Sequence, residues 1–208
     1  MIRLYRGIQY VTFFKNRDMG FDVYGVNPKR NTEKKPILLK EYFDLNEEER
    51  EKYIEESRKF EKENPGEYFR NNVWWWRPLW DYVCHVCQDV MSEEDVRAGH
   101  YNDGIIINAE TCDAMLEKLM VELATDGHIN FENQYKVEQE NAPLIDCDLC
   151  EGTGKRKPAP NIGAGDVHCN KCDGKGQTKP WSSNYPFSVE NVEEFVSFLS
   201  ECGGMQIC

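Results

Sequence analysis

The features that would assign a function most directly are missing from this sequence. No apolar run approaches the roughly 18 residues that a membrane-spanning helix needs. The opening stretch MIRLYRGIQYVTFFKNRD has neither the apolar core nor the cleavage site of a secretory signal peptide, so we expect reduced cysteines and a cytoplasmic protein. The glycine-rich loops of nucleotide-binding folds, the G-x-S-x-G of serine hydrolases and the paired histidines of zinc hydrolases are also absent. The sequence therefore offers no familiar catalytic motif.

Positive charge is also scarce. The chain has 25 lysines and arginines against 37 aspartates and glutamates, which gives a net charge of −12 at pH 7. Because this excess of acid repels phosphates, we expect neither nucleic acid nor a membrane as a partner. The charge is compatible with a basic partner or with mimicry of nucleic acid, but it is typical of any soluble acidic protein. Hydrophobic residues make up 40% of the chain, so a packed core is feasible.

Cysteine, by contrast, occurs in a repeated unit. The stretches CDLCEGTG and CNKCDGKG both follow C-x-x-C-x-G-x-G, and eighteen residues (151–168) separate the two cysteine pairs. This spacing is typical of a four-cysteine zinc site, because two intervening residues bring paired sulfurs to one ion and the glycines let the chain turn behind it. Disulfides are the alternative, which the odd total of nine cysteines disfavours. The pattern predicts one structural Zn²⁺ ion held by Cys147, Cys150, Cys169 and Cys172.

The repeated unit resembles the cysteine-rich zinc domain of DnaJ-type co-chaperones. That family carries four such units and two zinc ions, so two units imply one ion here. The resemblance covers only residues 147–177, and the His-Pro-Asp signature of a J-domain is absent. It therefore implies a metal-binding geometry and not a co-chaperone function.

A second resemblance covers nearly the whole chain from Met19. The segments GFDVYGVNPK, EYFRNNVWWWRPLWDYV, AGHYNDG and YPFSVENVEEF look like those of a group of small proteins from bacteriophages and bacteria. The resemblance implies no established activity, but it does imply the cytoplasm of a bacterial host cell. Residues 31–66 look like an insertion relative to that group.

Hydrophobic periodicity predicts an α+β fold of amphipathic helices and short strands, with a zinc-stapled hairpin. We expect an α+β domain at 1–143 that contains the helical insertion 31–66, a zinc module at 144–180, and a C-terminal helix and strand at 181–208 that pack on the main domain. Helices are predicted at 46–63, 78–90, after Ser92, at 109–125, 128–141 and 189–201. Strands are predicted at 8–14, 21–24 and 205–208, and residues 105–107 are expected to form either a short strand or the lead-in to the next helix.

Several polar residues are expected to cap these helices. Side-chain oxygens at a helix start accept backbone N–H groups of the first turn. The expected caps are Asn46, Ser92, Asn108 and Ser188. The helix at 109–125 is expected to bury a stripe formed by Cys112, Met115, Leu116, Leu119, Met120 and Leu123.

The most unusual segment after the zinc units is a run of three tryptophans followed by arginine: Trp74, Trp75, Trp76 and Arg77. Three adjacent tryptophans cannot all face inward, so at least one is expected at the surface. Exposed aromatic rings beside an arginine can stack a base or another flat ligand. Large rings also serve simply to pin loops to a small core.

A predicted loop, AGHYNDG, brings an imidazole, an amide and a carboxylate together at His100, Asn102 and Asp103. Such groups can bind a metal or carry out acid–base chemistry. Asn-Asp-Gly is also ordinary turn chemistry.

Two further motifs each allow a functional and a plain interpretation. Cys84 and Cys87 form a third C-x-x-C, which either joins Cys202 or Cys208 at a second metal or supplies small buried side chains; we favour the second. The basic run 155–157 either contacts phosphate or an acidic partner or is a solvated loop, and we favour the loop.

Together these patterns favour a non-enzymatic zinc-binding protein that binds an unknown protein or small-molecule partner through the tryptophans and the His100 loop. One alternative is a small enzyme that acts on a nucleotide-like substrate through His100 and Asp103. Another is a chaperone-like or redox helper that uses the cysteine-rich module, although tightly metallated thiolates argue against redox chemistry.

Overall fold

The computed structural model describes residues 20–31 and 45–208, so the strand predicted at 8–14 lies outside the described part. The described α-helices are α1 (Glu47–Glu63), α2 (Val73–Val86), α3 (Glu93–Tyr101), α4 (Ala109–Ala124), α5 (Gly127–Glu140) and α6 (Val189–Leu199), with a 3-10 turn, η2 (Trp181–Asn184). The strands are β1 (Gly20–Gly25), β2 (Tyr68–Asn72), β3 (Ile106–Ile107), β4 (Ile145–Asp146), β5 (Lys155–Arg156), β6 (Val167–His168), β7 (Gln177–Thr178) and β8 (Met205–Ile207). The predicted α+β class is confirmed.

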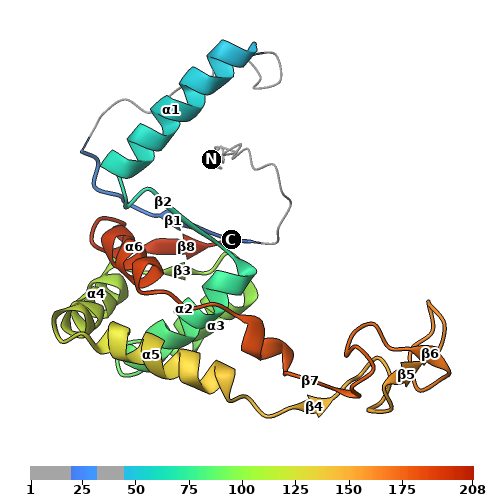
Figure 1. The fold of residues 1–208 in the computed structure, drawn as a ribbon. Helices are drawn as coiled ribbons and strands as arrows, with labels where there is room; N and C mark the ends of the chain where they lie inside the picture. Colours follow the sequence, from blue (N-terminus) through green and yellow to red (C-terminus); the bar gives the residue numbers. More distant parts are fainter. Residues whose placement is uncertain (1–19, 32–44) are drawn as a thin grey trace, which may run out of the picture.

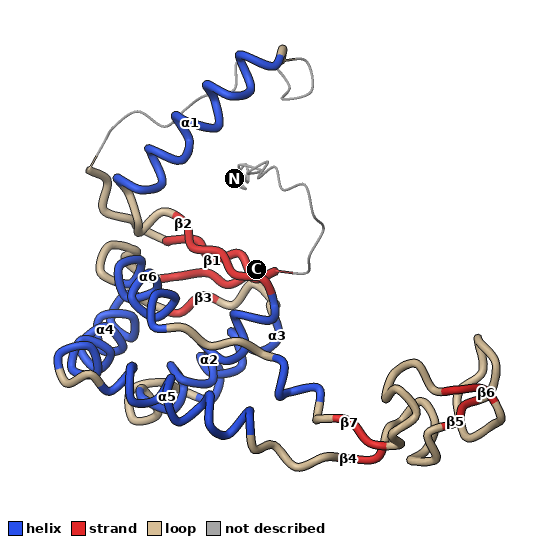
Figure 2. Tube along the Cα trace, viewed as in Figure 1, coloured by secondary structure: helices blue, strands red, loops and turns tan. Residues whose placement is uncertain are grey.

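The main sheet has four antiparallel strands in the order β2-β1-β8-β3. Strand β8 lies inside this sheet between β1 and β3, so segments far apart in the sequence pair there (Figure 2). Along β1, Phe21 and Val23 are buried, while the other residues of the strand are only partly covered. This alternation is the period of two expected of a strand with one face on the core.

Helices cover that buried face (Figure 1). Aromatic rings belong to the core between the helices and the sheet. The ring of Trp76 stacks against Phe21 at 5.1 Å and against Trp80 at 5.3 Å between centroids. The two indole N–H groups donate to backbone oxygens of α3, Gly99 at 2.7 Å and Val96 at 3.0 Å. Stacking and hydrogen bonding together fix α3 against α2.

The predicted caps are present. The side chains of Asn46, Ser92, Asn108 and Ser188 each accept the backbone N–H three residues further along. The helices that these four residues begin are therefore confirmed. So are the helix over 128–141 and the strands at 21–24 and 205–208, within a residue or two at their ends, and of the two alternatives at 105–107 the strand is the one observed.

Helix α2 differs from its prediction at both ends. It begins at Val73, five residues before Pro78, and it ends four residues earlier than predicted. The early start arises because Oδ1 of Asn72 accepts the N–H groups of Trp74 and Trp75 at 3.0 and 3.1 Å. Pro78 therefore lies inside the helix, where it leaves one carbonyl without its usual donor.

Two smaller expectations were also wrong. The supposed loop around His100 is the last turn of α3, which continues to Tyr101. Met120 is 51% exposed, because it lies one residue (about 100°) beyond the α4 face that buries Met115 and Leu119.

Helix α1 projects from the body and buries only Phe60 of its own residues (Figure 1). Its base is held by Asn64, whose Oδ1 accepts the N–H of Asn31 at 2.8 Å, and by an ion pair between Arg30 and Glu67. The two ends of the segment 31–66 thus lie close together.

Residues 144–180, called the arm below, extend away from the helical body as a long hairpin (Figures 1 and 2). Strands β4 and β7 pair at its root, and β5 and β6 pair at its far end. Within residues 20–31 and 45–208, no helix is both long and apolar enough to cross a bilayer.

Candidate metal centre

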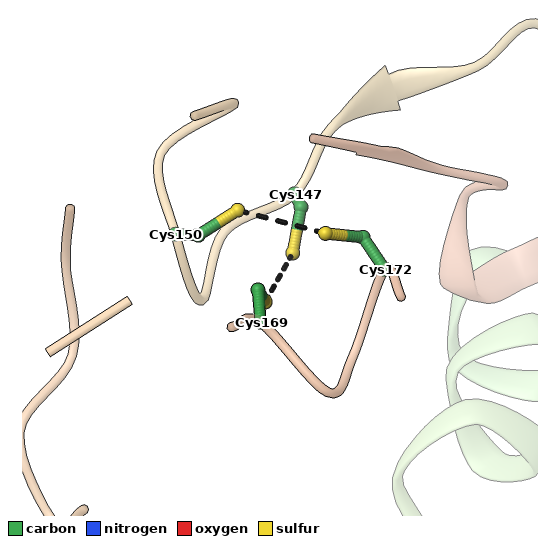
Figure 3. Close-up of side chains that lie close together, drawn as sticks. All are labelled: Cys147, Cys150, Cys169 and Cys172. Carbon is green, nitrogen blue, oxygen red and sulfur yellow. Dashed lines mark hydrogen bonds between the residues drawn. The ribbon is translucent and has the colours of Figure 1, made fainter. Parts of the chain in front are cut away.

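The four cysteines of the repeated unit meet in the arm, between its root and its far end (Figure 3). The Sγ atoms of Cys147 and Cys169 are 3.8 Å apart, those of Cys150 and Cys172 are 3.7 Å apart, and all four lie within 4.8 Å of one another. Sulfurs at the usual Zn–S distance of about 2.3 Å form a tetrahedron with edges of about 3.8 Å. The spacing matches such a site and is far longer than the about 2.05 Å of a disulfide bond.

Each C-x-x-C unit turns in the same way around its sulfurs. The N–H of Gly154 donates to Sγ of Cys150 at 3.3 Å, and the N–H of Gly176 donates to Sγ of Cys172 at 3.2 Å. The residue after each second cysteine has a positive φ, 53° and 49°, and the glycines that follow have φ values of 72–79°. N–H donors stabilise thiolate over thiol, so both turns favour the metal-binding form of their cysteines.

Backbone hydrogen bonds also join the two cysteine units to each other. The N–H of Cys147 donates to the oxygen of Gly176 at 2.8 Å, and that of Cys169 donates to the oxygen of Gly154 at 3.0 Å. A Cβ on Gly154 would lie 2.2 Å from the oxygen of Gly174, and one on Gly176 would lie equally close to the oxygen of Gly152. The glycines of the repeated unit are therefore needed both for the turn and for the close contact between units.

Burial and hydrogen bonding act on the thiols in opposite directions. The four cysteines are at most 4% exposed. Burial raises the pKa of Cys150 to about 11. At Cys169 burial acts in the same direction, but the N–H groups of Cys172 and Lys171 outweigh it and lower the pKa to about 6. A divalent ion that binds all four sulfurs displaces the remaining protons.

The donor set also indicates what kind of centre this is. Four thiolates in a tetrahedron suit Zn²⁺ and leave no open position for a water or a substrate. The four-cysteine cluster is therefore suited to a structural ion. Within the described residues it is the only group of three or more potential ligands that come together in this way.

The third C-x-x-C takes no part in this cluster. Cys87 is fully buried and its Sγ contacts the oxygen of Met115 at 3.8 Å, whereas Cys84 is partly exposed. Burial raises the pKa of both thiols to about 12, so both stay protonated at neutral pH. This arrangement fits small core side chains, the interpretation favoured from the sequence.

The three consecutive tryptophans have three different environments. Trp76 has no exposed surface and belongs to the core, and Trp75 is half-buried. Trp74 lies at the root of the arm, where its ring is 5.2 Å from those of Trp181 and Tyr185. Trp181 is 61% exposed, so this aromatic cluster is open to solvent on one side.

The residues of the AGHYNDG segment are also separated. Asn102 ends α3 in the left-handed conformation with φ 54°, and Asp103 forms an ion pair with Arg97 at 3.5 Å. Within the described residues no hydrogen bond or ion pair joins His100 to Asp103. Two surface hollows of about 600 and 570 Å³ include none of the tryptophans 74–76, Arg77 or His100 in their linings.

One residue that the sequence analysis did not consider, Asp81, lies near two that it did. Asp81 has exposed surface, but the protein around its carboxyl displaces enough water to raise its pKa, and the charges of His100 and Arg77 act against that rise. Asp81 is four residues after Arg77 on α2, so the two share a helix face. That spacing was visible in the sequence, but the approach of α3 from the side was not.

No protein-family model, curated protein or solved structure matches this chain. The assignment of the centre therefore rests on its own geometry, and the two family resemblances remain expectations.

Proposed function

We propose that the protein is a non-enzymatic zinc protein that presents its arm and the adjoining aromatic surface to a partner. One Zn²⁺ ion, held by Cys147, Cys150, Cys169 and Cys172, would fold the arm. We also infer that residues 144–180 are a module separate from the body, and that the protein works in the bacterial cytoplasm, as its second family resemblance implies.

The observation that carries this proposal is the composition of the arm's interior. The body has a large apolar core, whereas the buried cluster of the arm consists of the four cysteines alone, with Leu149 packed beside them. The paired strands of the arm are two residues long, too short to be stable without further support. A bound metal ion supplies the stability that so small an apolar interior lacks.

The partner surface that we propose differs from the one expected from the sequence at Trp76, which is left out, and at Trp181, which is added. Trp74, Trp75, Arg77 and His100 have surface exposed to solvent, and the open ring of Trp181 extends the surface of Trp74 toward the arm. Trp76 contributes only support from the core. Asn102 and Asp103 remain candidates through their exposed side chains.

Hydrogen exchange with and without a zinc chelator tests this function. We expect chelation to remove protection from 144–180, while α4 and α6, which bury their own apolar stripes, keep theirs. A matched measurement on Cys169→Ser should reproduce the chelated pattern without chelator. Protection that is lost evenly along the whole chain, or kept throughout the arm, would contradict the proposal.

A further inference from the structure

The arm differs from the rest of the chain in charge. Residues 144–180 contain six lysines and arginines and five aspartates and glutamates, a net charge of +1, so the other 171 residues carry −13. The far end of the arm lies well away from the acidic body (Figure 1). Because the Debye length is about 8 Å at physiological ionic strength, a partner at that end is governed by the local charges of the arm.

Some of the arm's cations are already paired. Lys171 forms an ion pair with Asp148 at 2.6 Å, and Lys179 donates to two carbonyl oxygens at the end of α5 at 3.0 and 3.2 Å. The remaining cations have no anionic partner within the described residues; they are Lys155, Arg156, Lys157 and Lys175. Three of the four are consecutive and begin at β5.

Arg156 is the best placed of these to bind an anion. Its Nη1 donates to the oxygen of Lys157 at 3.1 Å, but its Nε is buried and has no hydrogen-bond partner. Strand pairing sets Arg156 opposite Val167 and beside Ala164, so its nearest cross-strand neighbours are aliphatic. Because Nε is covered and Arg156 keeps part of its surface exposed, a partner's carboxylate reaches the guanidinium through its terminal N–H groups.

The neighbouring exposed side chains indicate which anion. Ile162 is 68% exposed and Val167 is 42% exposed, and both lie at this end of the arm. Residues 144–180 contain no phenylalanine, tyrosine or tryptophan, and stacking on such rings is a main source of affinity for single-stranded nucleic acid. Aliphatic side chains beside a cation suit a protein segment better, because its own apolar side chains can cover them.

We propose that the far end of the arm binds an acidic segment of a partner protein in which carboxylates alternate with aliphatic side chains. Arg156 binds a carboxylate, Lys155 and Lys157 add attraction, and Ile162 and Val167 pack against the aliphatic groups. This inference rests on the proposed function, because the surface exists only when the zinc-folded arm holds β5 against β6.

Fluorescence anisotropy of the zinc-loaded full-length protein, with a labelled peptide of repeated Glu-Leu pairs as probe, tests the inference. We expect binding that weakens as salt is raised. Arg156→Glu should weaken binding at least ten-fold. Ile162→Ser should weaken it several-fold with the same salt dependence, and this exposed position carries little risk to folding. Lys52→Glu on α1 makes the same charge change outside the arm and should leave affinity within about two-fold.

The zinc content of every sample separates two kinds of failure. Wild-type protein without zinc would overturn the proposed function itself. A zinc-loaded protein that ignores the peptide, or that loses as much affinity through Lys52→Glu as through Arg156→Glu, would overturn only the inference. So would tighter binding of a single-stranded oligonucleotide of equal length. Salt-sensitive self-association that Arg156→Glu abolishes would show that a second copy of this chain binds the far end of the arm. That result would also overturn the inference.

Discussion

Replacing Gly154 by alanine tests whether zinc binding depends on the close backbone contact between the two cysteine units. Gly154 has φ +76°, and a Cβ there would lie 2.2 Å from the backbone oxygen of Gly174. Left-handed backbone costs a residue with a Cβ roughly 1–2 kcal/mol. Forcing the backbone of the other unit aside adds about 1–3 kcal/mol, as for other overpacked sites. The total is about 2–5 kcal/mol.

This strain should appear as lost zinc affinity. The buried cluster of the arm contains the four cysteines and little else, so the strained conformation is adopted only when the metal is bound. We expect Gly154→Ala to weaken zinc binding by about thirty-fold to several thousand-fold. Competition with a chromophoric chelator at fixed pH measures this change directly.

Gly152→Ala provides the matched control within the same unit. Its φ is +79°, but the nearest atoms to a new Cβ belong to the Asp146 side chain, at 3.2 Å and beyond, which is exposed and can move. Only the cost of the left-handed backbone, roughly 1–2 kcal/mol, applies here, so zinc affinity should fall by about five- to thirty-fold. Gly176→Ala should match Gly154→Ala, because it meets the oxygen of Gly152 at 2.2 Å. Equal losses of zinc affinity for Gly152→Ala and Gly154→Ala would show that the close contact between the two cysteine units does not contribute.

Other predictions concern the body. Trp76→Ala should lower the free energy of unfolding by about 3–5 kcal/mol in denaturant melts, since the ring is fully buried. Arg77→Ala should lower it by less than about 1 kcal/mol. Similar losses for both variants would show that the whole segment is structural. Asn72→Ala should cost about 1 kcal/mol by removing the α2 cap, and an unchanged melt would refute that role. Because the pKa of Asp81 is raised in the folded state, its ionisation opposes folding, so stability should fall as pH rises through that raised pKa. Asp81→Asn should remove this pH-dependent loss, and a wild-type profile would show that the residue is not responsible.

The parts of the fold that could be predicted from sequence are those with a local cause. Asn46, Ser92, Asn108 and Ser188 cap helices because the oxygen and the N–H that it accepts are three residues apart. The cysteine cluster was predictable for the same reason, since each pair of ligands and its glycines lie within eight residues.

The parts that could not be predicted depend on contacts between distant segments. The start of α2 is an exception: its cap, Asn72, is as local as the other caps, but Pro78 is also a favourable start for a helix and led to the later start that was expected. The three tryptophans were expected to divide between core and surface, but it is the packing of Phe21 and α3 that selects Trp76 for the core. The place of Asp81 beside His100 depends in the same way on α3 packing against α2.

The most direct test of the central claim is the metal content of the purified chain. Native mass spectrometry of protein prepared under reducing, chelator-free conditions should show one zinc ion per chain, and Cys169→Ser should lose it. Cys87→Ser, which alters a buried cysteine outside the cluster, should keep it. A metal-free wild-type chain whose arm is nonetheless protected from hydrogen exchange would contradict the account.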